Sequence, residues 1–452
     1  MDMEMPDVIA VPYPYQGHLN PMLHFCSCLS GRGVRVTLVL THGVAKSMPQ
    51  STLSQSFHTV ECISDGTDVA TSPRNLEENS RLPAAVSEGV AAIIQNQKKA
   101  SGGSTAKVLV HDAMMPWLLE VGRAGGLRVA SLFTQPASLC AIYYHMLRGH
   151  VVQQLTASHS MLRLPSLPEM ELSDLPSFSH FADAAKEVAE LNICQASNLP
   201  KADCFLINTF DSLEDQVVKW MADKWPVKTV GPLVPILHKD RIDLFELDTE
   251  SHVQWLDIRE SKSVVYVSFG SLAVFTEEQM QEIAWGLAQS NKYFIWVVRE
   301  SEQVKLPKDF KSKISKKGVI VKWCHQVEVL SHKAIACFMT HCGWNSTLEA
   351  LCLGVPMVCM PQFVDQSTNA KLVEDVWKVG VRVKVNEKGI VTRQEVESCI
   401  KQVTEGEKVQ QFQRNVIKWK GLAKETTSEG GSSYVNINDF ISQMAFVKSH
   451  FN

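Results

Sequence analysis

The sequence of residues 323–366 is WCHQVEVLSHKAIACFMTHCGWNSTLEALCLGVPMVCMPQFVDQ, and the fold can be argued outward from it. An apolar run at 334–339 is typical of a buried strand, and the polar turn HCGWNS follows it directly. The residues after the turn predict a helix over 347–353, and a second apolar run at 355–360 predicts another strand. The stretch therefore predicts one strand–turn–helix–strand unit of an α/β fold.

The predicted turn carries groups that a bound phosphate requires. A helix start presents backbone N–H groups, and Gly343 permits close approach to them. His341 and Ser346 can donate hydrogen bonds to the same oxygens. Glu349 can accept from ribose hydroxyls, as acidic residues do in other dinucleotide sites, and Trp323 offers a flat face for a base. Taken singly, each residue also fits an ordinary buried αβ unit with a capped helix.

Composition limits the class of protein. The length of 452 residues predicts two or three domains. The composition, with 45% hydrophobic and 20% charged residues, is ordinary for a soluble globular protein. The net charge is −4 and no basic patch interleaved with aromatics stands out, which argues against a nucleic-acid partner. The N-terminal MDMEMPD is unlike a signal peptide, and no uncharged apolar run reaches about eighteen residues. We expect a cytoplasmic protein without an integral membrane segment, and a monomer.

Cysteine and histidine usage argues against a metal site. The twelve cysteines are scattered through apolar segments without a CxxC pair, so they are interpreted as reduced core residues. The histidines lack metal-ligand spacing, and no HExxH motif occurs. We therefore expect neither a metal nor a resident cofactor.

Strand-like and helix-like segments alternate along the chain. In the first half, short runs rich in Val, Ile and Leu lie at 8–12, 34–40, 58–63, 108–111 and 129–133, with helical segments at 21–31, 76–99 and 117–123 between them. The pattern restarts at 263–269 and continues with strands at 293–298, 318–321, 334–339 and 355–360. This alternation predicts parallel sheets with helices on both faces.

Two Rossmann-like, doubly wound parallel-sheet domains fit this pattern, with a ligand cleft at the carboxyl ends of their strands. We expect the first domain over residues 1–236, a linker over 237–252, the second domain over 253–430, and a separate last segment over 431–452.

Two residues in the first half form a candidate acid–base pair. His18 follows the first predicted strand, and Asp112 ends the strand at 108–111, so both can meet at the carboxyl edge of one sheet. An Asp fixes the tautomer of a His and stabilises the imidazolium that forms, which makes the His a general base. The helix that starts near His18 would oppose its premature protonation. The simpler alternative is that His18 only caps this helix.

As a block, residues 323–366 resemble the signature box of plant family 1 UDP-dependent glycosyltransferases. The resemblance covers nearly the whole chain and includes VPYPYQGHLNP (11–21), VHDAMMPW (110–117), LFTQP (132–136), INTFDSLE (207–214), VGPLVP (230–235), WLDIRESKSVVYVSFGS (255–271) and EGGSS (429–433). FTQP, MPQF and NAKLVEDVWKVGVRV (369–383) look most like the branch that glucosylates hormones, phenolic acids and terpenoids or steroids. The resemblance implies the GT-B fold, two Rossmann-like domains facing a cleft, with a last helix near 432–446 returning to the N-terminal domain.

The resemblance also implies a reaction. His18, oriented by Asp112, would take the proton from an acceptor hydroxyl or carboxyl, and the acceptor oxygen would attack the anomeric carbon of a UDP-sugar in line, inverting it. UDP would leave with its charge stabilised by the helix start at 343–346, His341 and Ser271 rather than by a metal.

Matching residues imply how UDP-glucose, the expected donor, is held. Trp323 would stack on uracil, Cys324 (through its backbone) and Gln326 would meet base or ribose, and Glu349 would accept from ribose hydroxyls. His341, Gly343, Trp344, Asn345 and Ser346 would surround the diphosphate and sugar, with Ser271 near the phosphates.

Three further residues would contact the sugar. Asp365 and Gln366 would hold its hydroxyls, and Thr134 would approach it from the N-terminal domain. A final Gln rather than His in the box tends to accompany glucose over galactose. The one visible departure is Phe363, where many relatives have Trp.

Other classes of protein fit less well. A glycoside hydrolase typically needs two carboxylates facing one bond, and a dinucleotide oxidoreductase needs GxGxxG after its first strand, where this chain has YPYQGH. A non-catalytic UDP-sugar-binding or sensor protein would keep the box but lose His18 or Asp112, and it remains the alternative.

The acceptor is expected to be small and hydrophobic, lined by residues near Tyr15, Met114, Phe133, Tyr143 and 178–181, although the same residues fit core packing. A phenolic, a hormone acid and a terpenoid or steroid alcohol all stay open.

Overall fold

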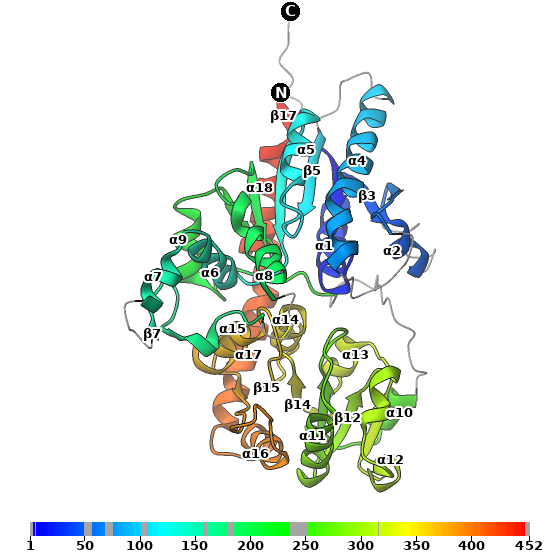
Figure 1. The fold of residues 1–452 in the computed structure, drawn as a ribbon, viewed down its shortest axis with the longest axis vertical. Coiled ribbons are helices and arrows are strands. Elements are labelled where there is room, and N and C mark those ends of the chain that lie inside the picture. The colour runs from blue at the N-terminus through cyan, green and yellow to red at the C-terminus, as the bar shows by residue number, and fades with distance from the viewer. Residues whose placement is uncertain are drawn as a thin grey trace, which may run out of the picture. The chain divides into compact units, whose positions relative to one another are not determined.

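The computed structural model describes residues 3–4, 6–48, 57–67, 76–100, 107–156, 161–178, 185–235, 251–314 and 316–447. The chain divides into two compact units, whose elements are labelled in Figure 1. Unit 1 comprises Met1–Glu171, Phe181–Leu244 and Glu425–Asn452, and unit 2 comprises Leu172–His180 and Phe245–Lys424. The chain therefore enters unit 2 twice and returns to unit 1 each time.

Unit 1 is built on a seven-stranded sheet in the order β10-β9-β6-β5-β2-β3-β4, with every neighbouring pair parallel. From β2 the chain moves outward to β3 and β4, and it then returns to β5 on the opposite side of β2. The switch in direction therefore lies between β2 and β5, where open α/β sheets bind ligands. The strands are β2 (Asp7–Val11), β3 (Arg35–Thr41), β4 (Thr59–Ile63), β5 (Lys107–Asp112), β6 (Arg128–Phe133), β9 (Cys204–Ile207) and β10 (Val227–Thr229).

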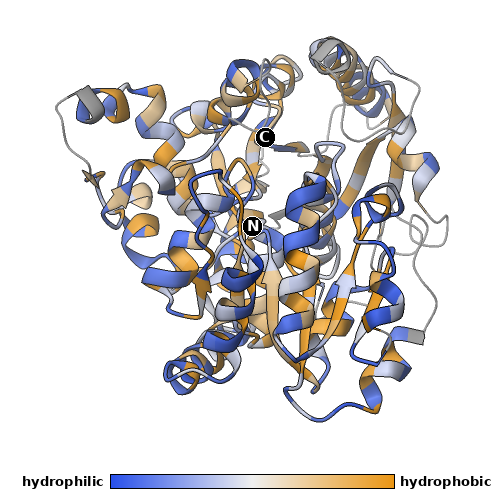
Figure 2. Cartoon of the chain, turned by 60° about the horizontal axis from the view of Figure 1, so that its bottom comes forward, coloured by the Kyte–Doolittle hydropathy of each residue, from blue (hydrophilic) through white to orange (hydrophobic). Residues whose placement is uncertain are grey.

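Both faces of this sheet are buried, because successive side chains of a strand point to opposite faces. In β2, Val8 and Ala10 join one hydrophobic cluster with α1 (Gln16–Ser30) and α18 (Ser432–Met444). Ile9 and Val11 join a second cluster with α4 (Leu76–Ala100) and α5 (Leu118–Ala124). Figure 2 shows the hydrophobic residues concentrated along the strands and on one side of the helices.

Unit 2 is built on a six-stranded sheet in the order β13-β12-β11-β14-β15-β16, again with parallel neighbours. Numbered within the unit, this is the order 3-2-1-4-5-6 of dinucleotide-binding folds, with the switch point between β11 and β14. The strands are β11 (Val264–Ser268), β12 (Tyr293–Val297), β13 (Gly318–Val321), β14 (Ile335–Thr340), β15 (Met357–Cys359) and β16 (Gly380–Arg382).

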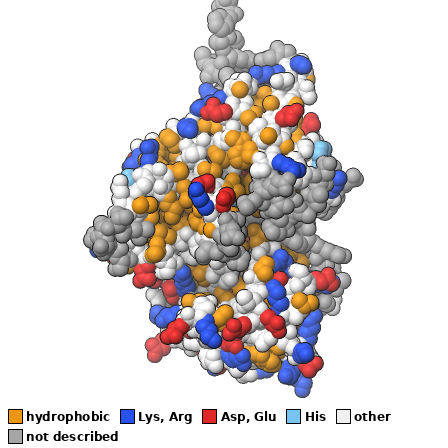
Figure 3. Space-filling model, in the orientation of Figure 1, with side chains coloured by type: hydrophobic (Ala, Val, Ile, Leu, Met, Phe, Trp, Pro, Cys, Tyr) orange, Lys and Arg blue, Asp and Glu red, His pale blue; other side chains and the backbone are white. Residues whose placement is uncertain are grey.

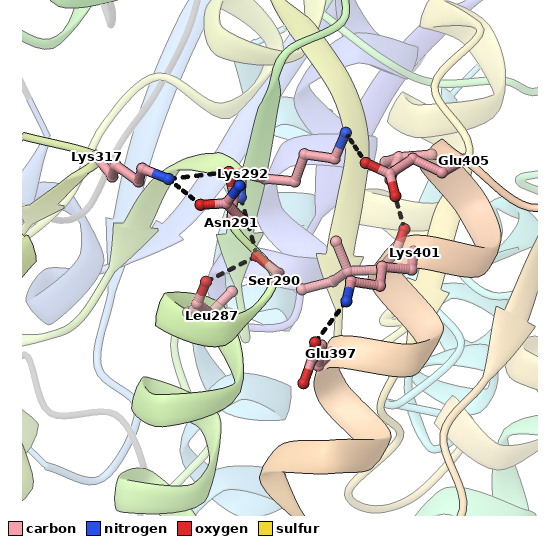
Figure 4. A network of polar contacts seen from close by, with 10 residues as sticks. Leu287, Ser290, Asn291, Lys292, Lys317, Glu397, Lys401 and Glu405 are labelled. Carbon is pink, nitrogen blue, oxygen red and sulfur yellow. Dashed lines mark hydrogen bonds and ion pairs between the residues drawn. The ribbon is translucent and has the colours of Figure 1, made fainter.

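One face of this sheet packs on α11 (Glu277–Gln289) and α16 (Arg393–Thr404). The two helices approach closely at Gly286, where a Cβ atom would lie 2.5 Å from Cβ of Val396. At the amino ends of the strands, Lys292 pairs with Glu405 at 2.7 Å, in the polar network of Figure 4. This edge is opposite to the carboxyl ends, where ligands of such sheets bind.

The other elements connect these layers. The helices are α2 (His42–Ser47), α6 (Ala137–Leu147), α7 (His150–Thr156), α8 (Ala185–Ile193), α9 (Asp215–Ala222), α10 (Ser251–Asp257), α12 (Phe310–Ile314), α13 (Gln326–Ser331), α14 (Trp344–Leu353), α15 (Gln366–Lys371) and α17 (Val409–Thr427). The short helices are η1 (Leu172–Asp174), η3 (Cys194–Asn198), η4 (Glu300–Lys305) and η5 (Leu372–Val376), and β1 (Met3–Glu4) pairs with β17 (Phe446–Val447) and β7 (Met161–Leu162) with β8 (Met170–Glu171). Within the described ranges, none of the helices is both long and apolar enough to cross a bilayer.

The unit boundaries differ from the expected domain boundaries at two places. The sequence analysis places 172–180 in the first domain, whereas the structure groups this segment with unit 2. The physical reason is that Asp174 forms an ion pair with Arg382, and Ser177 pairs with Val364 through the backbone. Unit 1 resumes at Glu425 rather than at residue 431. Most of the expected linker at 237–252 lies outside the described residues.

Candidate active site

The carboxyl edge of unit 1 brings His18 and Asp112 together. His18 lies in the first turn of α1, which follows β2, and Asp112 is the last residue of the neighbouring strand β5. The His18 Nδ1 atom is 2.9 Å from Asp112 Oδ2. The Asp112 side chain is 0% exposed, whereas that of His18 is 16% exposed. The carboxylate is therefore buried and the imidazole reaches the surface of the unit. The catalytic roles of the pair stay a prediction.

The hydrogen bonds around this pair assign its proton. A carboxylate accepts hydrogen bonds and donates none, so the His18 Nδ1–H donates to Asp112. The other carboxylate oxygen of Asp112 accepts from the backbone N–H of Met114 at 2.9 Å, which fixes the orientation of the carboxylate. In this tautomer the Nε2 atom of His18 carries the lone pair. A general base requires such a lone pair.

Thr134 belongs to the same cluster. Its hydroxyl oxygen lies 3.0 Å from His18 Nδ1, and the residue is 2% exposed. The turn after Thr134 is held by Glu214, whose carboxylate oxygens accept from the N–H groups of Ala137 (2.9 Å) and Ser138 (2.8 Å) at the start of α6. The sequence analysis quoted Glu214 within the motif INTFDSLE but gave it no role. An acidic residue far along the chain carries no local signal that it caps α6.

The carboxyl edge of unit 2 places a histidine ring between two glycines. A Cβ atom on Gly270, after β11, would lie 2.8 Å from His341 Nε2, and one on Gly343, after β14, would lie 2.5 Å from it. Both strands flank the switch point, so the ring sits where a nucleotide would be expected. Burial lowers the pKa of His341 to about 4, although a hydrogen bond to the Ser268 backbone opposes this shift. The ring is therefore neutral at pH 7.

Helix α14 starts at this turn without a side-chain cap. Its N-cap is Gly343, which has no side chain to satisfy the first N–H groups. Cys342, just before it, has a left-handed φ of 63°, which is uncommon for a residue other than glycine. Ser271 is half-buried in the turn after β11, and Asn345 is half-buried in the first turn of α14. These features are typical of an anion-binding helix start.

The side chain of Trp344 is not at the surface of the turn, and the role that the resemblance implies for this residue stays a prediction. Its side chain is buried, with 3% of the residue exposed, and its ring centroid lies 6.0 Å from that of Trp377. The ring is therefore part of the core of unit 2. What Trp344 presents at the start of α14 is its backbone.

Three predicted donor residues form one hydrogen-bonded group. Gln326 Nε2 donates to Ser346 Oγ at 2.8 Å and to Glu349 Oε2 at 2.6 Å. Gln326 Oε1 accepts from the Tyr266 hydroxyl at 3.3 Å. The group joins the start of α13 to the first turns of α14. Tyr266 was not predicted as part of the site, because it lies inside a strand that the pattern marks only as buried.

Trp323 and Cys324 precede this group in the chain. Trp323 is half-buried, and Cys324 is 4% exposed with its Sγ atom 3.6 Å from the Tyr266 hydroxyl. Burial of its side chain is consistent with the expectation that Cys324 acts through its backbone.

Asn369 is a residue that the sequence analysis missed. Its Nδ2 atom donates to the Cys342 carbonyl at 2.8 Å and to Asp365 Oδ2 at 2.6 Å. One buried amide thus ties the turn before α14 to the turn before α15. In the sequence, Asn369 is the first residue of NAKLVEDVWKVGVRV (369–383), a stretch that was used only to compare the chain with one branch of the family. No neighbouring residue indicates its contacts with Cys342 and Asp365.

Gln366, the last residue of the signature box, is oriented by the backbone. Its Oε1 atom accepts from the N–H groups of Gln362 (2.8 Å) and Phe363 (3.2 Å). The carbonyl end of the side chain is therefore used internally, and the amide Nε2 is the end that would donate to a ligand. Phe363, the departure from the family pattern, is 6% exposed.

The residues expected to line the acceptor site are mostly core. Phe133 and Tyr143 are 0% exposed and contact each other edge to face at 6.4 Å, and Met114 is 5% exposed. Tyr15 is half-buried against Tyr13 at 5.0 Å. Phe178 is half-buried and belongs to unit 2, whereas 179–181 lie outside the described residues. For Phe133 and Tyr143 the structure favours the alternative of core packing, because their rings fill the interior of unit 1.

The arrangement of ionisable side chains in the described part of the chain bears on whether a metal could bind. Within these residues, no group of three or more His, Cys, Asp or Glu side chains could hold a metal ion. On the face drawn in Figure 3, the described Lys and Arg side chains of unit 2 are interspersed with Asp and Glu.

Two Rossmann-like units, one with a histidine–carboxylate pair and one with a glycine-lined helix start suited to an anion, are typical of enzymes that act on a nucleotide-linked substrate. The chain belongs to the UDP-glucoronosyl and UDP-glucosyl transferase family, whose model matches residues 18–428. More narrowly, it is a UDP-glycosyltransferase of the plant family 1 type with the GT-B fold.

Individual relatives agree over nearly the full chain. UDP glycosyltransferase 9 of Catharanthus roseus is 48% identical, with 97% of each chain covered. Mogroside I-E synthase of Siraitia grosvenorii is 43% identical, also with 97% of each covered. The structure of Os79 from O. sativa in complex with UDP has a TM-score of 0.87 at 35% identity, covering 97% of this chain and 100% of that one. This enzyme therefore transfers a sugar from a UDP-sugar to a small metabolite.

Proposed function

We propose that this enzyme transfers glucose from UDP-glucose, with inversion, to a hydroxyl or carboxyl of a small hydrophobic metabolite. In this proposal His18 is the general base and Asp112 orients it. The observation that carries the proposal is the 2.9 Å contact between His18 Nδ1 and the buried carboxylate of Asp112, which leaves Nε2 to accept a proton.

The proposed step balances without a further reactant. Nε2 of His18 takes the proton from the acceptor O–H, and the acceptor oxygen forms a bond to the anomeric carbon. The bond from that carbon to the diphosphate oxygen breaks, and UDP leaves with the electron pair. Asp112 stabilises the imidazolium that results, as a carboxylate beside a histidine does in other enzymes.

Unit 2 is proposed to stabilise the leaving group. The developing charge on the diphosphate would meet the start of α14, where the N–H groups and the helix dipole favour an anion. His341 stays neutral at pH 7 because burial lowers its pKa to about 4, so it contributes a hydrogen bond rather than a charge. Donors fixed before the reaction stabilise developing charge without reorganising. The proposed step therefore requires no metal.

Glucose is proposed as the sugar because the signature box ends in Gln366 rather than His. The amide oxygen of Gln366 accepts from two backbone N–H groups, which leaves its Nε2 atom to donate to a sugar hydroxyl. Asp365 would accept from sugar hydroxyls beside it. For the acceptor, a phenolic, a hormone acid and a terpenoid or steroid alcohol are the candidate classes. One relative, Os79 from O. sativa, is 36% identical and has a structure in complex with U2F and trichothecene, which supports a small-molecule acceptor.

The test is UDP release from UDP-glucose in the presence of EDTA, with a panel of phenols, carboxylic acids, terpenoids and steroids. Products are analysed by mass spectrometry for the gain of one hexose, and by NMR for the configuration of the new bond. Hexose transfer with inversion is expected. Tight UDP binding without transfer to any acceptor would favour the sugar-binding or sensor alternative.

Two variants separate the roles of the units. His18→Ala is expected to lower kcat by about 10²–10⁴-fold, the usual contribution of a general base, while UDP affinity stays within about twofold. Glu349→Ala is expected to weaken UDP binding first, because Glu349 lies in the donor group of unit 2. His42→Ala, an exposed histidine at the start of α2, is the matched control and should change neither quantity. A larger loss of UDP affinity than of kcat in His18→Ala would contradict the assignment.

A further inference from the structure

A short segment between β8 and α8 contributes to unit 2 although the chain on both sides of it belongs to unit 1. The described part of this segment, residues 172–178, includes η1 and packs against α15. Helix α15 begins at Gln366, and Asp365 is its N-cap. Both residues proposed to bind the sugar therefore lie at the start of this helix. The segment is therefore next to the sugar turn (residues 361–366) without containing any of its residues.

Asp174 is the main polar anchor of the segment. It is 4% exposed, and its carboxylate accepts from Arg382 Nη1 at 2.8 Å and lies 3.4 Å from Lys371 Nζ. Arg382 Nη2 also donates to the Ser173 carbonyl at 3.0 Å. A buried carboxylate is stable only when it is paired in this way. Arg382 ends β16 and Lys371 ends α15, so Asp174 joins the sheet edge to the helix.

The backbone of the segment adds two further connections. The Asp174 carbonyl accepts at 2.7 Å from Oγ1 of Thr368, which lies in the first turn of α15. Ser177 and Val364 pair as an isolated antiparallel bridge, in which the Ser177 N–H donates to the Val364 carbonyl at 3.0 Å and the Val364 N–H donates back at 2.5 Å. Both the helix and the turn before it are thus held from outside.

Val364 explains why the turn needs this support. Its φ is 54°, in the left-handed region that a β-branched residue rarely adopts. Such a conformation persists only where the surroundings impose it, and it is often found next to functional residues. The bridge to Ser177 uses both backbone groups of Val364, immediately before Asp365.

We propose that Asp174 and Ser177 are positioning residues for the donor sugar, which hold the turn at Val364 and helix α15 so that Asp365 and Gln366 meet the sugar hydroxyls. Neither residue touches the substrate in this proposal. It rests on the proposed role of Asp365 and Gln366. It predicts that changes in the segment weaken recognition of the sugar more than recognition of UDP. The Gln326–Ser346–Glu349 group lies on other elements, and α15 contacts the turn before α14 through Asn369.

The test is calorimetric titration of UDP and of UDP-glucose, without acceptor, into wild type and variants. Asp174→Asn keeps the side-chain volume and removes the charge, and Ser177→Pro removes the N–H that donates to Val364. Each is expected to weaken UDP-glucose binding by roughly tenfold, as misplacement of positioning groups does, and to change UDP binding by less than about twofold. Either variant alone tests the proposal if the other does not fold.

Two further variants separate the possible failures. Asp365→Ala should directly lose the contribution that the sugar makes to the affinity for UDP-glucose. Glu282→Gln removes another partly buried ion pair of unit 2, to Arg393, and should leave the ratio of the two affinities unchanged. If Asp365→Ala loses the sugar contribution while Asp174→Asn and Ser177→Pro keep it, the positioning role is wrong and the proposed function stands. If Asp365→Ala keeps it, the sugar assignment itself is wrong, and the positioning role is wrong with it.

Discussion

The two units have the same strand order around the switch point but place different chemistry there. In unit 1 the first strand, β2, leads to His18 and the fourth in order, β5, ends at Asp112. In unit 2 the corresponding strands, β11 and β14, lead to Gly270 and to the His341–Gly343 turn. One edge thus presents a side-chain pair, and the other presents glycines and a helix start.

The difference shows how one topology supports two tasks. The proposed proton transfer needs a side chain with a lone pair and a second group that orients it, and the histidine of unit 1, backed by a buried carboxylate, can supply both. The proposed binding of a diphosphate needs backbone N–H groups that a ligand can approach, and unit 2 has two glycines there, at which a Cβ atom would collide with the His341 ring. Topology provides the crevice, and the residues after two strands determine its chemistry.

The largest expected effect breaks the unit 1 pair. Asp112→Asn should lower kcat by about 10²–10⁴-fold with little change in UDP affinity, because an amide can donate to His18 Nδ1 and favour the tautomer with Nε2 protonated. Steady-state kinetics and UDP titration measure the two quantities. Asp7→Asn, which removes a carboxylate paired with Arg35 at the start of β2, is the control. Equal losses in both variants would mean that the effect on Asp112 is structural.

The next effect breaks the unit 2 turn. In Gly343→Ala the new Cβ atom would lie 2.5 Å from His341 Nε2, so the ring or the helix start must move. We expect UDP affinity to fall by roughly 10–100-fold, since misplacement of positioned groups by about 1 Å costs this much. Gly421→Ala in α17 has nothing within 4 Å of its Cβ and should leave binding unchanged. Unchanged UDP affinity in Gly343→Ala would remove this turn from the donor site.

A third prediction concerns two neutral histidines, one at each edge. Burial lowers the pKa of His111 to about 4, partly opposed by its hydrogen bond to the Asp112 carbonyl, and burial lowers that of His341 to about 4 as well. The unfolded chain binds these protons near pH 6.5 and the folded chain does not. The free energy of unfolding should therefore be unaffected by these two groups above pH 6.5, and it should decrease as the pH drops from 6.5 toward 4.

Urea unfolding at pH 7 and pH 5 measures this dependence. For His111 alone, linkage predicts a loss of about 2 kcal/mol between pH 6.5 and pH 5. His111→Gln should reduce the slope of the unfolding free energy against pH by the equivalent of up to one proton. The control is His42→Gln, which changes an exposed histidine of unit 1 and should leave the slope unchanged. An unchanged slope in His111→Gln would show that this imidazole is already protonated in the folded protein at pH 5.

The smallest effect is expected at the amino ends of the strands of unit 2. Glu405→Gln removes the ion pair with Lys292 shown in Figure 4, in which the Glu405 side chain is 54% exposed. An exposed pair contributes about 0–1 kcal/mol, so the unfolding free energy should change little and UDP-glucose turnover should not change. A clear loss of turnover would mean that the two edges of the sheet are coupled.

Most of the strands could be predicted because their signal is local. The run at 108–111 agrees with β5 (Lys107–Asp112) to within one residue at each end. β9, β10 and β16 were missed. β10 and β16 have three residues each, including the charged Lys228 and Arg382, and owe their conformation to their neighbours in the sheet. Helix α6 was missed for another reason. Its sequence, ASLCAIYYHML, is apolar on nearly all sides and has no clear 3.6-residue period.

The candidate site divides in the same way. Residues within one strand–turn–helix unit, such as His341 and Glu349, could be recognised from their spacing and from the resemblance. Residues that act across the chain could not, because a contact such as that of Asp174 with Arg382 spans 208 positions. Asn369 is intermediate, since it connects two turns that are close in the sequence but whose geometry no pattern reveals.

The last helix has a consequence for how the protein is made. α18 contributes Ile437, Phe440, Ile441 and Met444 to the same core cluster as β2 and α1. On the ribosome, roughly 200 residues separate β10 from α18, and at about 5–20 residues per second the nascent chain waits about 10–40 s for that helix. During this time most of unit 2 is synthesised, while the face of unit 1 that holds Phe25 stays incomplete. Unit 1 is therefore completed only after unit 2 has been synthesised. Until then the apolar surface that α18 will cover is a defined site for chaperones to protect.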